Sequence, residues 1–200
     1  MERGELWSIA PDKTVTVLAT NFGGKQFNGP NDLWISPDGG IYFADPNYRV
    51  TFMIRDPTAR MPGQHVYFMA PDLKTVTRVT TDLFNPNGVV GTPDGRVLYV
   101  GDLVGLTTWV YDIQPSGGLT NKRLFYDHGS DGMTIDTEGN VYLTSNGVTV
   151  LDKTGKKIEQ INLPEGTSSN VTFGGKDRDL LFIIGISYVY GLKMRVKGAR

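Results

Sequence analysis

The strongest constraint on the fold of this chain is a phrase that recurs along it. The phrase first occurs at residues 29–45 as GPNDLWISPDGGIYFAD, where a polar residue precedes two apolar segments joined by a tight turn. Four copies can be recognised, and each opens with a short amide or carboxylate residue: Asn31, Asn87, Asp131 and Asn170. These residues are 56, 44 and 39 positions apart. A period of roughly 40–50 residues with several strands per unit is typical of a β-propeller.

The shared phase of the four residues, called the ring residues below, predicts that they lie close together. Propeller blades are antiparallel sheets packed around a central axis, so residues at one phase of every blade point to one place. If the first strand of each copy is the innermost, the ring residues surround the mouth of the channel. Their oxygens would then suit a hard cation. The alternative is a local role, because Asn, Asp and Gly are common in turns. We favour the shared site because every copy continues into apolar strand residues.

The turns of the repeat carry residues of their own. A glycine stands eight positions after the ring residue in the first three copies, and Arg178 takes that position in the fourth. The acidic residues at the turns are expected to stabilise the turns themselves. Two further carboxylates, Asp45 and Asp102, follow the second strand of their copies. These two either reach the channel or cap a loop, and the sequence leaves both alternatives open.

Several motifs of the chain resemble one known family. The segment PND before a strand, the SPDG-type turn, IYFADPNY, PNG and SDGM occur in the order found in gluconolactonases, regucalcin (senescence marker protein) and related lactonases. The resemblance runs from about residue 14 to the end of the chain. It implies an all-β, six-bladed propeller with one divalent cation in the channel. Ca²⁺ is the first choice for that cation, with Zn²⁺, Mg²⁺ or Mn²⁺ as alternatives.

The same resemblance implies roles for particular residues. Asn87 and Asp131 match two protein ligands of the metal, and Asp131 also matches the residue usually proposed as general base. Asn31 matches an amide close to metal and substrate. The remaining ligand in the family is a glutamate near the start of the first blade, and no residue of this sequence matches it.

A long connection between strands, residues 46–64, is the candidate for a lid. It carries several arginines, among them Arg49, the expected substrate-binding cation. Long loops in compact domains are often functional, and guanidinium groups attract an acidic substrate or a carboxylate product. The alternative is a solvated surface loop.

The repeat predicts that the chain forms a single, incomplete propeller domain. Residues 1–28 are expected to form the outer half of a blade, followed by blades at 29–80, 81–127 and 128–165 and a last partial blade at 166–200. This organisation predicts three full and two partial blades, without the first blades of the family. Such an arc would leave apolar faces open, so we expect self-association and little activity from the isolated chain.

Composition excludes several other classes. A net charge of -1 argues against a nucleic-acid binder, and the basic segment at 194–200 is expected to be a solvated end. The sequence has no cysteine, two histidines and no G-x-S-x-G phrase, which argues against thiolate sites and a nucleophile elbow. The longest apolar run, near residues 180–186, is too short to span a bilayer. Location remains open between cytoplasm and periplasm.

The function expected from this pattern is metal-dependent hydrolysis of sugar lactones to aldonic acids, as in a gluconolactonase. One alternative is a calcium-binding propeller module without catalysis, which would use the same ring residues. Another is an esterase or phosphotriesterase on the same fold, because a fold does not set its substrate. No nucleic-acid or membrane partner is expected.

Overall fold

Every regular element of the structure is a β-strand. The computed structural model describes residues 4–48 and 60–199, and no helix occurs in these ranges. Consequently, no helical segment of the described chain has the length and apolar character needed to cross a membrane.

Two short hairpins come first, and larger sheets follow. The hairpins consist of β1 (Leu6–Ile9) with β2 (Val15–Ala19) and β3 (Asn21–Phe22) with β4 (Lys25–Gln26). The first four-stranded sheet contains β5 (Leu33–Ile35), β6 (Ile41–Asp45), β7 (His65–Met69) and β8 (Val76–Arg78). The second contains β9 (Pro86–Gly91), β10 (Val97–Asp102), β11 (Thr107–Ile113) and β12 (Leu119–Tyr126). The third contains β13 (Met133–Ile135), β14 (Val141–Ser145), β15 (Gly147–Leu151) and β16 (Lys157–Ile161). A three-stranded sheet of β17 (Asn170–Gly174), β18 (Leu180–Ile184) and β19 (Val189–Lys193) closes the series.

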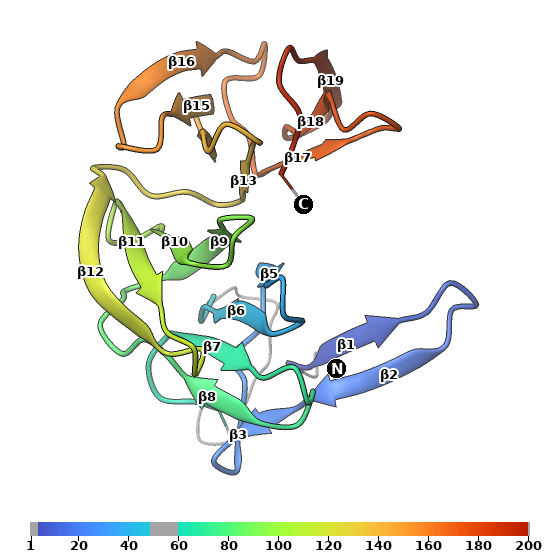
Figure 1. Ribbon diagram of the computed structural model, residues 1–200, viewed down its shortest axis with the longest axis vertical. Helices are drawn as coiled ribbons and strands as arrows, with labels where there is room; N and C mark the ends of the chain where they lie inside the picture. Colours follow the sequence, from blue (N-terminus) through green and yellow to red (C-terminus); the bar gives the residue numbers. More distant parts are fainter. Residues whose placement is uncertain (1–3, 49–59, 200) are drawn as a thin grey trace.

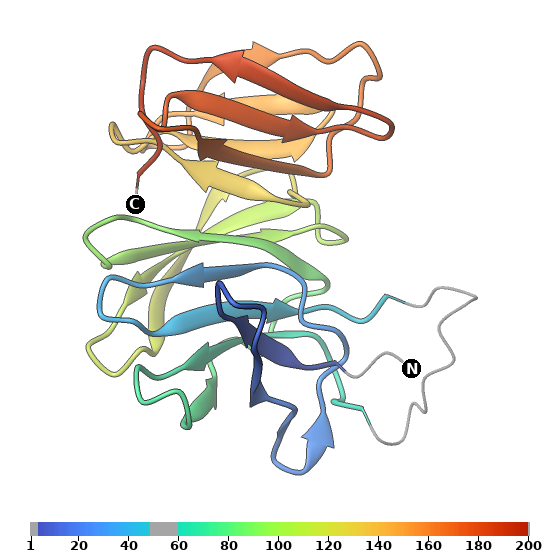
Figure 2. The same cartoon turned by 90° about the vertical axis from the view of Figure 1, so that its right-hand side faces the viewer.

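The sheets follow one another around an open arc (Figure 1). In each sheet the strands are antiparallel and hydrogen-bonded in sequence order, with the first strand innermost. Neighbouring inner strands touch, since β9 contacts both β5 and β13, and β13 also contacts β17. Seen from the side, the sheets form a stack (Figure 2). This arrangement confirms the predicted all-β propeller arc with three four-stranded blades.

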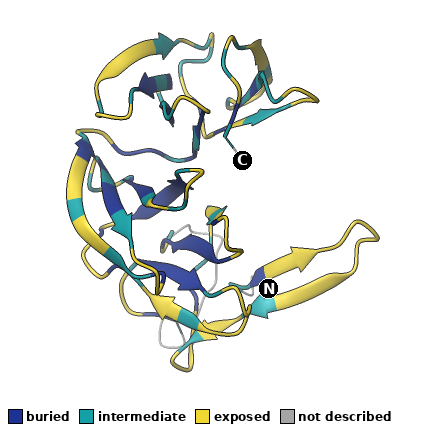
Figure 3. Ribbon diagram, viewed as in Figure 1, coloured by how far each residue is buried: buried dark blue, intermediate teal, exposed yellow. Residues whose placement is uncertain are grey.

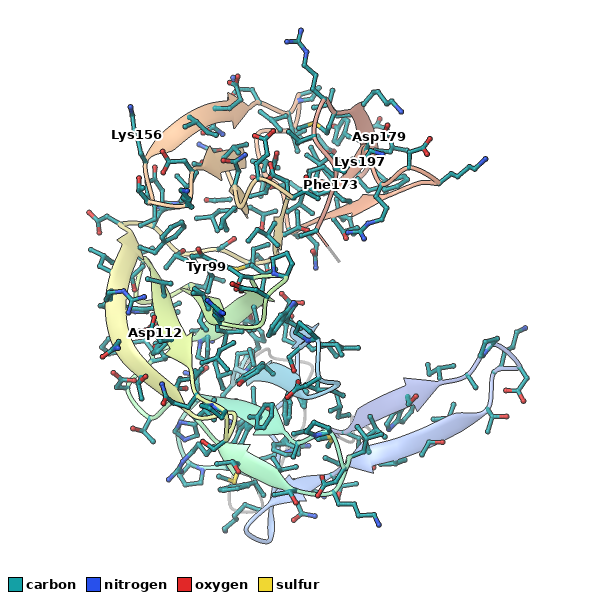
Figure 4. The ribbon with its side chains drawn as sticks, in the orientation of Figure 1. Tyr99, Asp112, Lys156, Phe173, Asp179 and Lys197 are labelled. Carbon is teal, nitrogen blue, oxygen red and sulfur yellow. The ribbon has the colours of Figure 1, made fainter. Side chains whose placement is uncertain are left out.

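Apolar side chains fill the spaces between neighbouring sheets. Successive strand residues point to opposite faces, so β10 serves two cores at once. Leu98 and Val100 pack against the first sheet, whereas Tyr99 packs with Phe125 and Met133 toward the third. Figure 3 shows that β6, β7 and β9 are buried, whereas the outer strands β12 and β16 are largely exposed, and Figure 4 labels Tyr99 in this core. The continuous apolar runs of the sequence are therefore strands covered on both faces.

The carboxylates at the ends of the second strands cap loops. Asp45 accepts hydrogen bonds from the backbone N–H groups of Asn28 and Gly29, at 2.9 and 2.7 Å. Asp102 accepts the equivalent bonds from Phe84 and Asn85, also at 2.9 and 2.7 Å. Both carboxylates are buried, and each fixes the loop that leads into an inner strand. The structure thereby decides between the two alternatives that the sequence left open.

The turn that follows each inner strand keeps one backbone conformation in all four copies. Gly39, Gly95 and Gly139 have φ angles of 91°, 71° and 86°, in the left-handed region. Arg178 in the fourth copy also has a positive φ, of 57°. The fourth turn therefore keeps its shape without a glycine, although a side chain in this region is disfavoured.

The basic end of the chain is not a free solvated tail, which corrects the expectation from the sequence. The backbone N–H of Thr137 donates to the carbonyl of Lys197 at 2.8 Å, and that of Ala199 donates to Ile135 at 3.0 Å. The two groups on the third sheet, the carbonyl of Ile135 and the N–H of Thr137, lie at the end of β13 and just after it. Backbone pairing of this kind was not visible in the sequence because the segment is short and its partner, near the end of β13, is about 60 residues away along the chain.

We predict that Gly101→Ala destabilises the fold at the contact between the second and third blades. A Cβ at Gly101 would lie 2.7 Å from the carbonyl oxygen of Ser130, which is backbone and cannot swing away. Overpacking of this kind typically costs about 1–3 kcal/mol. The matched control is Gly191→Ala in β19, where the nearest atom to an added Cβ is 3.7 Å away. Urea unfolding should show a lower midpoint for the first variant only, and equal midpoints would contradict this account of the contact.

Candidate functional site

The ring residues stand where the inner strands begin. Asn87 lies in β9 and Asn170 opens β17, while Asn31 and Asp131 precede β5 and β13 by two residues each. The four positions follow one another from blade to blade. Asp32, next to Asn31, accepts a hydrogen bond from Val89; Asn87 bonds to Asp131; and Gly132 lies against Asn170. The four positions mark the mouth of the predicted channel.

Two of the ring residues are in direct contact. The Nδ2 group of Asn87 donates a hydrogen bond to Oδ1 of Asp131 at 2.7 Å, and it also contacts the hydroxyl of Tyr48. Asn87 is 0% exposed, yet its Oδ1 atom has no hydrogen-bond partner among the described residues. A buried acceptor without a partner calls for an explanation, and a bound water or ion is one of them. We therefore centre the candidate site on Asn87, Asp131 and Tyr48.

The close approach of these residues depends on two glycines. A Cβ at Gly88 would lie 2.8 Å from the carbonyl oxygen of Asp131, and a Cβ at Gly132 would lie 2.4 Å from Oδ1 of Asn170. Each glycine directly follows a ring residue. Because it has no side chain, the next ring residue along the chain can pack closely against its backbone. A side chain at either position would push neighbouring inner strands apart.

Asp32 supports the site from the first blade. Its Oδ2 accepts a hydrogen bond from the backbone N–H of Val89 at 2.9 Å, two residues after Asn87, and its Oδ1 accepts one from Leu33 at 2.9 Å. Burial, with a smaller contribution from the negative charge of Asp131, raises the pKa of Asp32 to about 6. We did not predict this residue from the sequence. The available signal was that the corresponding positions in the next two copies are glycines.

The environment of Asp131 tunes its basicity. Partial burial raises the pKa of this carboxyl, and the hydrogen bond from Asn87 opposes that shift. A carboxylate with a raised pKa is a stronger proton acceptor than one in open water. The same burial raises the pKa of the Tyr48 hydroxyl to about 12, so that group remains a neutral hydrogen-bonding partner at neutral pH.

The other predicted residues have different positions. Asn31 is exposed, and its backbone N–H donates to Ala44 at 3.0 Å. The Oδ1 atom of Asn170 accepts the backbone N–H of Val171 at 2.8 Å. Within residues 4–48 and 60–199, neither side chain is hydrogen-bonded to Asn87 or Asp131. Arg49 lies outside the described residues.

The donor atoms at the site fit a hard cation. The described part of the chain contains no group of three or more His, Cys, Asp or Glu side chains that could hold a metal ion. The amide oxygen of Asn87, which has no partner among the described residues, and the carboxylate of Asp131 nevertheless belong to two side chains in contact, and both supply oxygen donors. Carbonyl and carboxylate oxygens are the donors that calcium and magnesium prefer.

The two histidines serve other positions. The Nε2 atom of His65 is 3.0 Å from the carbonyl oxygen of Pro62, and that of His128 is 3.0 Å from Oγ of Ser145. Among the described residues, neither ring is hydrogen-bonded to Asp131. The carboxylate in contact with Asn87 is thus that of Asp131.

The raised pKa of Asp32 predicts a specific dependence of stability on pH. The folded state holds the Asp32 proton more tightly than the unfolded state does, since the pKa rises from 3.8 to about 6 on folding. The associated stability is complete below the unfolded pKa and is lost as the pH rises through about 6. Urea unfolding in a chelator, at pH 4 and at pH 7, should show this loss in the wild type and a smaller loss in Asp32→Asn, which keeps only the contribution of other carboxyls with a raised pKa, such as Asp131.

The control for this measurement is Asp94→Asn. Asp94 is a turn residue whose pKa shifts in the direction opposite to that of Asp32. The hydroxyl of Thr92 lowers the pKa of Asp94, so its stabilisation is present above the unfolded pKa and is lost as the pH falls. Asp94→Asn should therefore keep the wild-type loss above pH 4. Identical pH profiles for the wild type and Asp32→Asn would show that Asp32 does not carry the effect.

Comparison with known proteins gives a consistent result. The family model described as SMP-30/gluconolactonase/LRE-like region matches residues 1–187. A gluconolactonase from Zymomonas mobilis is 32% identical over 180 residues, which cover 82% of this chain and 50% of that protein. A regucalcin from Danio rerio is 37% identical over 129 residues, which cover 59% of this chain and 43% of that protein.

A solved structure shares the same architecture. A gluconolactonase from Xanthomonas campestris has a TM-score of 0.81 and 31% sequence identity, over 96% of this chain and 65% of that chain. The chain spans about half the length of the curated relatives it matches. The family match, which covers residues 1–187, agrees with the propeller arc. The chain therefore belongs to the SMP-30/gluconolactonase/LRE-like family.

Proposed function

We propose that the protein hydrolyses sugar lactones to aldonic acids with the help of a divalent cation. The observation that carries the proposal is the buried Asn87, whose Oδ1 has no partner among the described residues while its Nδ2 holds Asp131. Sequence relatives named gluconolactonase support the choice of lactones as substrate class. The particular lactone is left open because the ring residues alone do not define it.

The residues that would hold the cation are Asn87, through its amide oxygen, and Asp131, through its carboxylate. We propose Ca²⁺ as the first choice, with Zn²⁺, Mg²⁺ or Mn²⁺ as alternatives, because both donors are oxygens. When bound, such a cation polarises a carbonyl oxygen and lowers the pKa of a neighbouring water. The remaining chemistry belongs to the side chains of the chain itself.

Asp131 is the proposed general base. Its carboxylate would take a proton from the water whose oxygen adds to the lactone carbonyl carbon. The ring C–O bond then breaks, the leaving oxygen gains a proton, and the product is a hydroxy acid. The amide N–H₂ of Asn87 holds the carboxylate of Asp131, and the hydroxyl of Tyr48 holds that amide group. This fixed geometry reduces the reorganisation that the reaction requires.

Two further residues are proposed to contact the substrate. The exposed side chain of Asn31 stands at the mouth of the arc, where its amide group can hydrogen-bond to substrate hydroxyls. Arg49, outside the described residues, is proposed from the sequence to attract the carboxylate of the product. Self-association through the open apolar faces of the arc also remains a proposal.

We predict that Asp131→Ala abolishes lactone hydrolysis and weakens cation binding in any version of this protein that carries the complete propeller. Loss of a general base typically lowers the rate by about 10²–10⁴-fold. The matched control is Asp94→Ala, because Asp94 occupies a turn and bonds to Thr92 there. The measurements are acid release from a panel of sugar lactones and calcium titration by calorimetry.

Each outcome of this comparison has a distinct meaning. Hydrolysis lost only in Asp131→Ala supports the proposed site, whereas equal losses in both variants would show that the ring does not carry the chemistry. Cation binding without turnover of any lactone in the wild type would favour a calcium-binding module without catalysis. Turnover of esters or phosphotriesters in place of lactones would reassign the substrate class.

A further inference from the structure

One position of the repeat is used in two different ways along the arc. In the first two blades, the last residue of the second strand is a buried aspartate that binds two consecutive backbone N–H groups. These N–H groups belong to the residues three and two positions before the ring residue. The distances, 2.7–2.9 Å at both places, are typical of charge-assisted hydrogen bonds. In two blades, therefore, the pair of backbone N–H groups before the ring residue binds a carboxylate.

The third blade lacks the aspartate. Ser145 is the last residue of β14 and pairs with Gly147, as Asp102 in β10 pairs with Thr107. Its Oγ lies 3.0 Å from Nε2 of His128. His128 and Gly129 stand three and two residues before Asp131, the positions that bind Asp45 and Asp102 in the preceding blades. The described part of the chain provides no hydrogen-bond acceptor for their two backbone N–H groups.

A cavity opens at this same point. It has a volume of about 480 Å³ and is lined by His128 and Ser145, by the outer strands β15 and β16 of the third blade, and by the segment that follows β16. Its polar lining consists of neutral and basic side chains without a carboxylate: His128, Ser145, Asn146, Thr149, Lys157, Gln160 and Asn162. Within this lining, Thr149 is bonded to Gln160 at 3.0 Å, which fixes the outer wall. The charge and the donor groups therefore favour an anion with hydroxyl groups.

We propose that this cavity binds the carboxylate of a small hydroxylated acid. The ligand carboxylate takes the place that Asp45 and Asp102 occupy in the first two blades and accepts hydrogen bonds from the N–H groups of His128 and Gly129. Ser145 and Lys157 add a hydroxyl donor and a positive charge, and Asn146 and Asn162 bind the hydroxyl groups of the ligand. The site is separate from the ring residues, and its existence does not depend on the proposed hydrolysis.

The first test uses D-gluconate as the probe and D-glucitol, which carries hydroxyl groups but no carboxylate, as the control. Two-dimensional NMR of the ¹⁵N-labelled protein in a chelator should show saturable shifts of the His128 and Gly129 amides with gluconate only. The same shifts should persist in Asp131→Ala, which separates this cavity from the ring site. Unchanged amides with gluconate, or equal shifts with glucitol, would overturn the proposal.

The second test supplies the missing carboxylate from the chain itself. Ser145→Asp should bind the two N–H groups internally, shift both amides without ligand, and weaken gluconate binding by at least about tenfold. The matched control is Ser116→Asp, which adds the same charge at an exposed turn and should leave binding unchanged. Lys157→Gln, at the rim, should weaken binding roughly twofold to fivefold and provides a readout if Ser145→Asp does not fold. Wild-type affinity in both cavity variants would refute the site.

Discussion

The structure depends on neighbouring sheets that bury each other's apolar faces. A strand such as β10 places Leu98 and Val100 on one face and Tyr99 on the other, so neither face can be left to water without cost. Each blade is therefore stable only against its neighbours, and contacts spread from blade to blade around the arc (Figure 1). The position of the inner strands follows from this packing. The inner strands that carry Asn87 and lead from Asp131 are held in place by this packing.

The candidate site takes its precision from that packing. Asn87 and Asp131 come from adjacent blades, and they meet because Gly88 lets the backbone of Asp131 approach closely. A buried acceptor without a partner costs roughly 1–3 kcal/mol, so the unpartnered oxygen of Asn87 is expensive unless a ligand uses it. The rigid frame tolerates this cost. The same frame raises the pKa of Asp131 by excluding part of its water.

The repeat also shows how one backbone arrangement acquires a new use. Asp45 and Asp102 bind pairs of N–H groups and fix the loops that enter the inner strands. In the third blade, Ser145 is too short to do so, and a cavity lined by donors replaces the carboxylate. In the first two blades this pair of N–H groups binds a carboxylate, which indicates what the equivalent pair in the third blade can bind. A structural position can thus become a binding position through the loss of one side-chain group.

The sequence by itself determined the fold class, because its repeat has the period of propeller blades. The fixed phase of that repeat also predicted that the four ring residues converge. Asn87 and Asp131 do meet, whereas among the described residues the side chains of Asn31 and Asn170 are not hydrogen-bonded to them. The sequence left open whether Asp45 and Asp102 cap loops, since both roles need the same residue at the same place. Only the tertiary structure decided the bonds between Asp32 and Val89 and between Tyr48 and Asn87. These contacts join segments from different blades. Their geometry depends on how closely two sheets pack, which no local pattern encodes.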